Sequence, residues 1–383
     1  MRAKVIAITA LVLFCNYFIW AVLNRPTDEV NWQGIIRGVS FSPYQSGQSP
    51  LAESHPSVDQ IDESLRFLSD KVRSVRTYTA LDGFEQVPEL AQKYGLTVTA
   101  GAWLDHRLDR NLREVDSLIE ELESNSNIDR AIVGNESVLR GDLDVAKLAD
   151  HLARVRQVAK VPVSTAEPWH VWLKYPELAD HVDFIAAHLL PYWEGVAADD
   201  ALGFVWDRYA ALKKAFPGKP ILIAEVGWPS GGNRQKWAKP SLVAQAKFVR
   251  QFLKGAEIQG ADYFVMEAFD QPWKRTIEGE AGAHWGLFTA QHEQKFAMVG
   301  PVVENPQWRA QVWVASAIAF LPMVLFLWYW QRVELGGQLF FTSLIQGAAS
   351  LVAWTVFIPL DSGLPVSSQI AWAVLVPAQF ALL

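Results

Sequence analysis

The two ends of the chain are almost purely apolar, whereas the middle mixes apolar and polar residues along its length. The first uncharged run covers Val5 to Leu23 and follows Arg2 and Lys4. Three further uncharged runs close the chain, at 311–330, 338–360 and 364–383. Each run reaches about the 20 residues that a helix needs to cross a bilayer. We therefore expect membrane helices at both ends.

The first run has the charged start of a signal peptide, but other features favour an uncleaved anchor. It ends at Trp20 and Asn24 without an Ala-x-Ala cleavage site. Two cations precede the run, whereas Arg25 follows it beside Asp28 and Glu29. Because the more cationic flank stays in the cytoplasm, we expect the N-terminus inside and the middle of the chain outside.

Between the apolar ends, short β-branched runs alternate with longer amphipathic stretches. The eight strand candidates are 36–41, 72–78, 97–102, 130–133, 161–165, 182–188, 220–226 and 262–268. Helical periodicity predicts helices between them, for instance at 58–70, 112–124, 145–159 and 242–259. Eight strands alternating with helices over about 270 residues are typical of a (β/α)8 TIM barrel, although an open doubly wound sheet also alternates. We predict an α/β fold in which the TIM barrel is flanked by transmembrane helices.

This pattern predicts three parts. They are an N-terminal anchor helix over 1–24, the barrel over 25–309, and three transmembrane helices over 310–383. The last run reaches Leu383 with no polar tail, so we expect this part to continue beyond the sequence. The lone Cys15 allows no intrachain disulfide here, so the fold must be held by its core.

Charge and tryptophan content narrow the function. With 34 Lys and Arg against 41 Asp and Glu, the net charge is −7, which disfavours a nucleic-acid partner. No spacing of His, Asp and Glu predicts a metal site, and we expect neither a metal nor a cofactor. The 17 tryptophans instead suit a carbohydrate site, where flat rings stack on sugar C–H faces.

Chemistry in a TIM barrel lies at the carboxyl ends of the strands and on the loops that follow them. Carboxylates and aromatic residues recur at nearly every predicted end. They are Tyr44, Tyr78, Trp103 with Asp105, Asn135 with Glu136, Glu167 with Trp169, His188 with Tyr192, Trp193 and Glu194, Glu225 with Trp228, and Glu267 with Asp270, Trp273 and Lys274. That combination indicates a sugar site in which acids cleave and rings stack.

Glu136 and Glu225 are the strongest catalytic candidates. They follow the fourth and seventh predicted strands, which face each other across a barrel mouth. Cleavage of a glycosidic bond with retention needs two carboxyl groups about 5–5.5 Å apart. Either glutamate could instead be a surface or ion-paired residue. Asn135 is well placed to hydrogen-bond a sugar 2-hydroxyl.

The residues around both glutamates resemble glycoside hydrolase family 17, the β-1,3-glucanases and glucanosyltransferases. The matching segments are Arg-Gly-Val-Ser-Phe-Ser-Pro-Tyr (37–44), Arg-Thr-Tyr (76–78), Val-Gly-Asn-Glu (133–136), Glu-Val-Gly-Trp-Pro-Ser (225–230), Glu-Ala-Phe-Asp-Gln-Pro-Trp-Lys (267–274) and His-Trp-Gly-Leu-Phe (284–288). The resemblance covers roughly residues 34–298 and implies Glu136 as acid/base and Glu225 as nucleophile. Relatives usually carry an acidic residue where Gln271 stands, which puts a supporting charge there in doubt.

The remaining site residues are expected to contact substrate or support the pair. We expect substrate contacts from Tyr44, Tyr78, Asn135, Tyr192, Trp193, Trp228, Glu267, Asp270 and Lys274. Tyr78 could hold a nucleophile oxygen, Lys274 could bind a sugar or steady a carboxylate, and Trp228 could be a platform or a packing residue. His188 is expected to be a satisfied polar contact.

These observations predict a retaining enzyme that remodels β-1,3-glucan as a glucanosyltransferase or endo-glucanase. The expected location is a bacterial inner membrane with the barrel on the periplasmic side, since the arrangement resembles bacterial proteins linked to periplasmic glucan synthesis. The expected partners are β-glucan, membrane lipid and a glycosyltransferase in the same chain or complex. A catalytically idle glucan-binding module of a synthesis or export complex is the alternative, and another β-glycan such as mannan or cellulose is a third reading.

Overall fold

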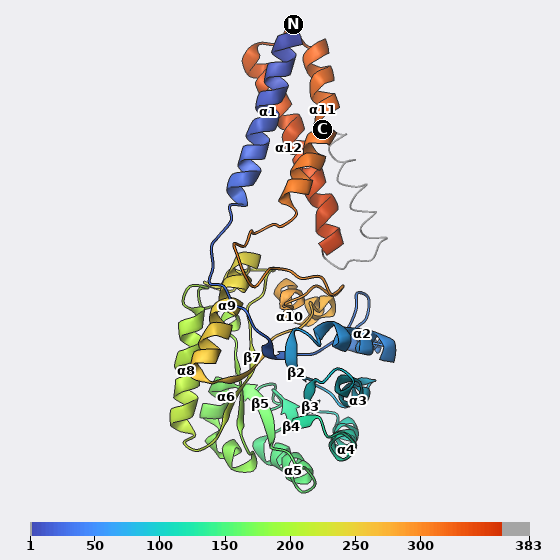
Figure 1. Cartoon of the computed structure of the whole chain (residues 1–383), viewed down its shortest axis with the longest axis vertical. Coiled ribbons are helices and arrows are strands. Elements are labelled where there is room, and N and C mark those ends of the chain that lie inside the picture. Colours follow the sequence, from blue (N-terminus) through green and yellow to red (C-terminus); the bar gives the residue numbers. More distant parts are fainter. Residues whose placement is uncertain (1, 362–383) are drawn as a thin grey trace. The chain divides into compact units, whose positions relative to one another are not determined.

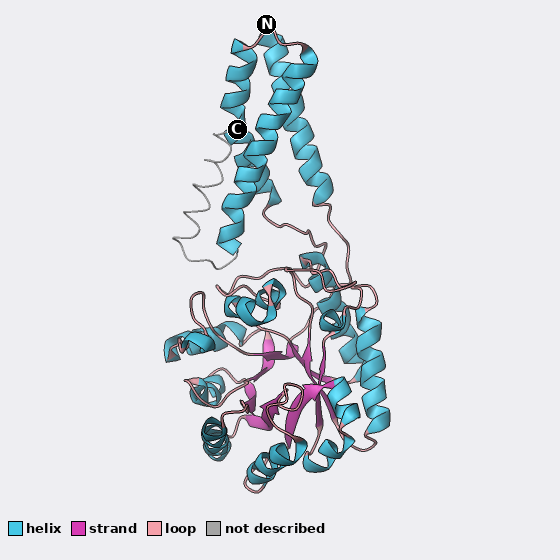
Figure 2. Cartoon of the chain, turned by 180° about the vertical axis from the view of Figure 1, so that it is seen from behind, coloured by secondary structure: helices cyan, strands magenta, loops and turns pink. Residues whose placement is uncertain are grey.

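The computed structural model describes residues 2–361, which form two compact units. One unit is Glu29–Gly300, and the other joins the segments before and after it. In the first unit a ring of strands is surrounded by helices (Figures 1 and 2).

The strands of the Glu29–Gly300 unit form one closed, parallel barrel in sequence order, which confirms the predicted TIM barrel. They are β1 (Ile36–Ser40), β2 (Val72–Arg76), β3 (Thr97–Ala102), β4 (Ile128–Asn135), β5 (Val163–Pro168), β6 (Ile185–Leu189), β7 (Ile221–Val226) and β8 (Asp262–Val265). A parallel barrel directs all the carboxyl ends to one mouth, so residues far apart in sequence meet there.

The helices follow the strands and cover the barrel's outer face. They are α2 (Val58–Leu68), α3 (Val87–Gln92), α4 (Leu108–Ser124), α5 (Val145–Arg156), α6 (Trp169–Lys174), α7 (Pro191–Glu194), α8 (Ala201–Ala215), α9 (Leu242–Gln259) and α10 (Arg275–Glu278). Side-chain caps start several of them: Ser57 caps α2, Asp144 caps α5 and Ser241 caps α9. The sequence thus marks the start of these three helices, whereas α4 and α8 begin without a side-chain cap.

Apolar side chains fill the barrel interior and explain its strands. One buried cluster joins Ile132, Ala166, Phe184, Ala186, Leu222, Ala224 and Phe264. Small residues recur beside large ones, as at Gly38, where a Cβ atom would lie 2.5 Å from the Phe264 ring. β7 is buried at every position, as expected for a strand covered on both faces. Glu225, the last residue but one of this buried strand, therefore has its carboxylate in a nearly dry site.

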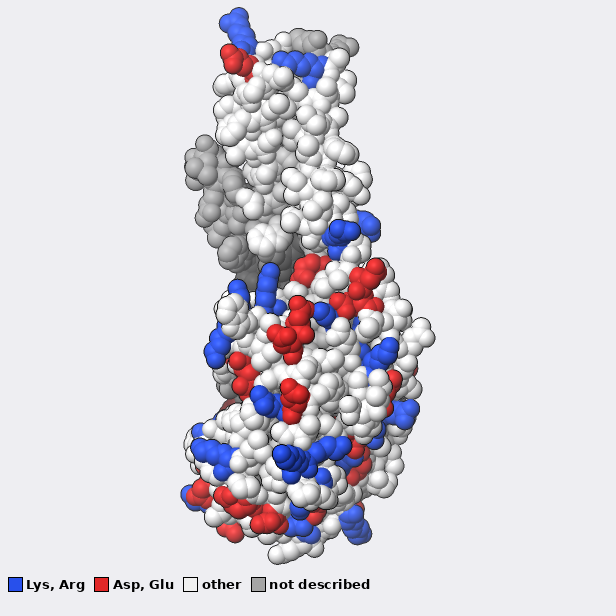
Figure 3. All heavy atoms as spheres, turned by 90° about the vertical axis from the view of Figure 1, so that its left-hand side faces the viewer, with Lys and Arg blue, Asp and Glu red and all other residues white. Residues whose placement is uncertain are grey.

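The second unit contains three described helices that are long and apolar enough to cross a membrane. They are α1 (Arg2–Leu23), α11 (Trp308–Tyr329) and α12 (Leu335–Asp361). Val12, Ala319, Met323 and Ala349 form their shared core. On the face shown in Figure 3 this unit is a broad surface almost without charged side chains, and the charges gather toward its ends. The run predicted at 364–383 lies outside the described residues.

Candidate active site

Glu225, at the end of β7, lies in a pocket of donors at the barrel mouth. Its Oε1 accepts hydrogen bonds from Arg76 Nη1 at 3.0 Å and from the Tyr78 hydroxyl at 2.9 Å. Arg76 is fully buried at the end of β2, and its Nη2 also donates to Asn135 Oδ1 at 2.5 Å. The guanidinium therefore fixes the carboxylate of β7 against the amide of β4.

These contacts decide the charge of Glu225. Burial would raise its pKa, but the positive charges of His188, Arg76 and Lys274 and the Tyr78 hydrogen bond together hold that pKa below its usual value. Burial and the Glu225 charge raise the pKa of Tyr78 well above its ordinary value, so the phenol stays a donor. Glu225 is consequently an ionised carboxylate in a nearly dry setting, as a nucleophile requires.

Glu136 follows β4 in a different setting. Its backbone is left-handed, with φ of 55°, two residues after Gly134 at φ of 83°. A non-glycine residue in this region costs on the order of 1 kcal/mol, which surrounding bonds must offset. The Glu136 amide donates to Ala166 O at 2.7 Å, and its carbonyl accepts from the Arg140 amide at 2.9 Å. The side chain is 28% exposed, so it can reach a bound sugar.

The two glutamates and His188 meet at the mouth. Their ligand-type atoms, one from each residue, all lie within 4.8 Å of one another. His188 Nδ1 is 2.8 Å from Glu136 Oε1, and Nε2 is 3.4 Å from Glu225 Oε1. This separation of the carboxylates suits retention rather than inversion, which needs room for a water between them.

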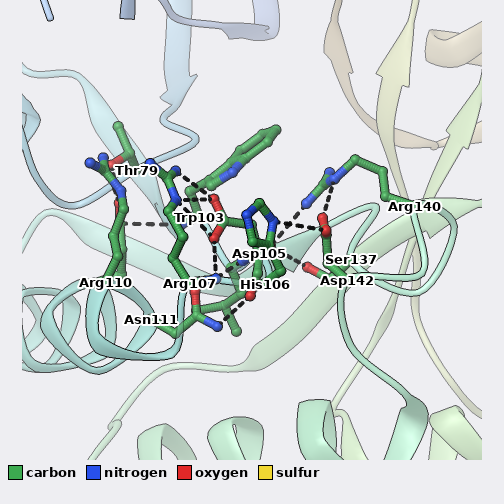
Figure 4. Close-up of polar contacts among 12 residues, drawn as sticks. Thr79, Trp103, Asp105, His106, Arg107, Arg110, Asn111, Ser137, Arg140 and Asp142 are labelled. Carbon is green, nitrogen blue, oxygen red and sulfur yellow. Dashed lines mark hydrogen bonds and ion pairs between the residues drawn. The ribbon is translucent and has the colours of Figure 1, made fainter. Parts of the chain in front are cut away.

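The loops after β3 and β4 brace the Glu136 backbone (Figure 4). Arg140 spans them: its guanidinium donates to Asn135 O, to Leu104 O at 2.9 Å and to Asp142 at 2.7 Å. The same guanidinium lies 4.5 Å from the centre of the Trp103 ring. Ser137 adds a hydrogen bond to Leu104 O at 2.9 Å. The side chains of Arg140 and Ser137 thus tie the backbone beside Glu136 to the loop after β3.

Lys274 and Glu267 form a second buried ion pair beside the first. Lys274 Nζ lies 2.9 Å from both carboxylate oxygens of Glu267. Burial raises the pKa of Glu267 to about 7, although Lys274 lowers it. Lys274 also lowers the pKa of Glu225. The lysine therefore steadies a carboxylate, one of the two roles that the sequence left open.

Two further carboxylates, those of Glu167 and Glu278, lie near Glu136 and Glu225. Glu167, at the end of β5, accepts from the amides of Val138 at 2.8 Å and Leu139 at 3.2 Å, and burial raises its pKa to about 7. It thereby supports the turn that carries Glu136. Burial also raises the pKa of Glu278, against the effect of Lys274, and its buried Oε2 has no hydrogen-bond partner among residues 2–361.

The aromatic residues expected to bind sugar divide by exposure. Trp193 is 37% exposed and stacks on Trp285 with centroids 5.8 Å apart, so it presents a free face. Trp228 is fully buried between Tyr192 and Phe248. Tyr192 is also buried, and its hydroxyl donates to Asn233 O at 2.7 Å. Trp228, left open as a platform or a packing residue, therefore packs in the aromatic cluster, and Tyr192, expected to contact substrate, has little free ring surface.

Other expected contacts support loops instead. Tyr44 is buried, with its hydroxyl 3.2 Å from His55 Nδ1 and its ring against Trp273. Asp270 accepts from the Gly286 amide and from Lys295, both at 2.8 Å. Both residues were expected to contact substrate; the Tyr44 hydroxyl and Asp270 Oδ1 instead have partners within the protein.

Gln271 is fully buried, which accounts for the departure from the family pattern. Its amide donates to the carbonyl oxygens of Ser42 and Phe269, while its Oε1 accepts from Trp273 Nε1 at 2.8 Å. A neutral amide can meet both demands, whereas a carboxylate has no proton to give.

Within residues 2–361, Glu136, His188 and Glu225 are close enough to offer ligand atoms to one metal ion. Arg76, however, contacts Glu225 Oε1 at 3.0 Å and supplies positive charge where a cation would have to bind. The donor set therefore fits a network of protons better than a metal.

Sequence reasoning missed Arg76 and Glu278 as site residues and underrated His188. Arg76 and His188 end strands β2 and β6, so the strand-end rule that found the glutamates reaches them too. Their roles do not stand out in the sequence, because their partners lie on other strands. Glu278 follows the motif at 267–274 by four residues and carried no signal of its own.

The part of the chain that carries this site is similar to known proteins. The family model described as BtgE/BtgC glycoside hydrolase domain matches residues 38–286. A protein of Aspergillus niger named as a glucan endo-1,3-β-glucosidase is 29% identical over 315 residues, which cover 72% of this chain and 46% of that protein. The chain therefore spans less than half the length of that relative.

Solved structures agree on the architecture. An active-site mutant of a β-1,3-glucanosyltransferase from Rhizomucor miehei, in complex with laminaritriose, is 27% identical with a TM-score of 0.61, and the match covers 69% of this chain and 97% of that one. An endo-laminarinase from Formosa, 18% identical with a TM-score of 0.59, covers 67% of this chain and 83% of its own and shares the fold.

Proposed function

We propose that this chain, which belongs to the BtgE/BtgC glycoside hydrolase domain family, cleaves β-1,3-glucan with retention, using Glu225 as nucleophile and Glu136 as acid/base. The carrying observation is the close pair of carboxylates in unequal surroundings. Glu225 is enclosed by Arg76 and Tyr78, whereas Glu136 is partly open and touches His188. The resemblance to family 17 drawn from the motifs is confirmed by the family match and by the Rhizomucor structure.

The first step uses this asymmetry. A Glu225 oxygen attacks the anomeric carbon as the bond from that carbon to the glycosidic oxygen breaks. Glu136 gives its proton to the departing oxygen, so a covalent glycosyl-enzyme forms and the leaving sugar chain carries a hydroxyl. Arg76 and Tyr78 hold the attacking carboxylate in place throughout.

The second step decides between hydrolysis and transfer. Glu136, now ionised, takes a proton from water or from a sugar hydroxyl, whose oxygen then displaces Glu225 from the anomeric carbon. We favour a sugar acceptor. The Rhizomucor relative, named as a glucanosyltransferase, supports this choice, and Trp193 offers an open ring on which an acceptor sugar could stack.

We further propose that the apolar helices anchor the barrel outside the cytoplasm, at a bacterial inner membrane, where it remodels periplasmic glucan. The apolar character of α1, α11 and α12 supports the anchoring, and Arg2 and Lys4 in the first turn of α1 support an N-terminus inside. Membrane lipid, and a glycosyltransferase in the same chain or complex, are the proposed partners. Reporter fusions after residue 24 and within the 331–334 turn test the orientation, and an external signal from the turn contradicts it.

The activity is tested with the full chain in detergent and laminari-oligosaccharides of defined length. Products longer than the substrate are expected from transfer, and only shorter products would contradict it. Binding without any turnover would instead favour the idle glucan-binding module, and turnover of mannan or cellulose alone would overturn the substrate. A 2-deoxy-2-fluoro glycoside should leave its sugar on Glu225, detected by peptide mass spectrometry.

A further inference from the structure

His188 lies between the two proposed catalytic glutamates and is almost completely enclosed, with 2% of its surface exposed. Its strand, β6, pairs with β5 and β7, and His188 lies opposite Glu225 in the register. Both ring nitrogens therefore face carboxylates: Nδ1 lies 2.8 Å from Glu136 and Nε2 lies 3.4 Å from Glu225. Among the described residues Nε2 has no hydrogen-bond partner, so its contact with Glu225 is electrostatic, and it is an ion pair only when the ring is protonated on both nitrogens.

The chemistry of imidazole limits the proton arrangements that this geometry permits. A neutral ring has one N–H and one lone pair, whereas the charged ring has two N–H groups. Glu225 Oε1 accepts from Arg76 and Tyr78, which favours its ionised form, and with Glu225 ionised all contacts are attractive in two cases. Either the ring is charged and both glutamates are ionised, or the ring is neutral with its proton on Nε2 and Glu136 carries a proton toward Nδ1. Both cases hold the same number of protons, and both leave Glu225 ionised.

We propose that His188 is a positioning residue that ties the protonation of Glu136 to the ionisation of Glu225 and so widens the pH range of turnover. This inference rests on the proposed function. The proton between Glu136 and the ring belongs to the pair, so the acid is lost only when the pair as a whole releases that proton. While the ring faces Glu225, the nucleophile resists protonation on the acidic side.

Other charged groups around the His188 ring determine how far the alkaline and acidic limits of turnover move when the ring is lost. Glu136 on β4, Glu167 on β5 and Glu225 on β7 face His188, and each interacts with its charge. Arg76 contacts Glu225 independently and remains when the ring is removed. Loss of the ring should therefore affect the alkaline limit, which depends on Glu136, more than the acidic limit, which Arg76 still supports.

The test compares pH profiles of kcat/KM for the wild-type chain and His188→Asn on laminari-oligosaccharide. The alkaline limb is expected to move to lower pH by about one unit and the acidic limb to move less, toward higher pH, with KM changed less than threefold. His181→Asn, at an exposed position before β6, is the matched control and should keep both limbs. A variant with lower kcat but unchanged limbs would mean a purely structural role and overturn the proposal.

A second measurement does not depend on the folding of that variant. The chain has 8 histidines, and ring-¹⁵N labelling reports the pH dependence of each. Glu136→Gln and Glu225→Gln should both alter the pH dependence of the same single histidine; no change in either would overturn the inference. A wild-type chain without glucan turnover overturns the proposed function as well, whereas an active chain with unchanged limbs overturns only this inference.

Discussion

The two ends of the barrel use the same residue types for different purposes. At the amino-terminal end, Arg130 Nη2 lies 2.9 Å from Asp262 Oδ2, and both side chains are about a quarter exposed, at 26% and 28%. At the mouth, Arg76 and Glu225 are 1% and 7% exposed at 3.0 Å. Water screens the first pair and not the second. Pairing alone thus does not mark function, whereas burial of the charge at the strand ends does.

The largest effect on the mouth is expected from neutralising Glu225, the buried carboxylate proposed as nucleophile. Glu225→Gln is expected to lower kcat by roughly 10⁴-fold or more while the chain still binds oligosaccharide, because the nucleophile is lost and the pocket is kept. Turnover assays and calorimetry measure the two quantities. Unchanged product formation would contradict the assignment of the nucleophile.

Glu136→Gln should have the next largest effect. Loss of the general acid is expected to cost about 10²–10⁴ in kcat on glucan, and less on an aryl glycoside whose leaving group needs no proton. Added azide should restore turnover by taking the place of the activated acceptor, with a β-glycosyl azide as product. An equal loss on both substrates would argue against the acid role.

Lys274→Met tests how much the buried ion pair of Lys274 and Glu267 at the mouth stabilises the fold. It leaves Glu267 without its partner, and a broken buried pair costs about 3–5 kcal/mol of stability. Burial already raises the pKa of Glu267 from 4.5 to about 7 against the pull of Lys274, so removing the lysine should raise that pKa further.

The pH dependence of Lys274→Met has a definite sign. A raised carboxyl pKa means that the folded chain holds the proton more tightly, so stability falls as pH rises toward the folded pKa. The deficit against wild type should therefore be smallest below pH 7 and grow above it, measured by urea unfolding of the detergent-solubilised chain. The double variant with Glu267→Gln should recover part of the loss; no recovery would contradict the pairing.

Arg130→Ala completes the comparison at the other end and should have the smallest effect. The partly exposed pair with Asp262 is expected to contribute about 1 kcal/mol or less, with kcat unchanged. Urea unfolding and turnover measured on the same sample give both numbers. A fall in kcat comparable to that of a mouth variant would show that the two ends are not as separate as their burial indicates.

The fold and the glutamate pair were within reach of the sequence, whereas the network around them was not. The alternation of apolar strands with amphipathic helices predicted the barrel because buried parallel strands must be apolar at nearly every position. The same strands located Glu136 and Glu225 at their ends. The sequence could not decide whether Trp228 and Tyr192 are sugar platforms or core residues, because aromatic residues suit both and their burial depends on packing with Trp285 and Phe248.

The sequence by itself determined the order of strands, the apolar ends and which acids end β4 and β7, since each is a local pattern with a fixed period. Only the tertiary structure decided that Arg76 would help keep Glu225 ionised, that His188 would lie between Glu136 and Glu225, and that Asp270 would support a loop. Those roles arise from residues that are separated in the sequence, by 149 positions for Arg76 and Glu225, and that meet at one mouth of a closed barrel. Charge at a site is set by such neighbours, and a sequence pattern does not specify their distances.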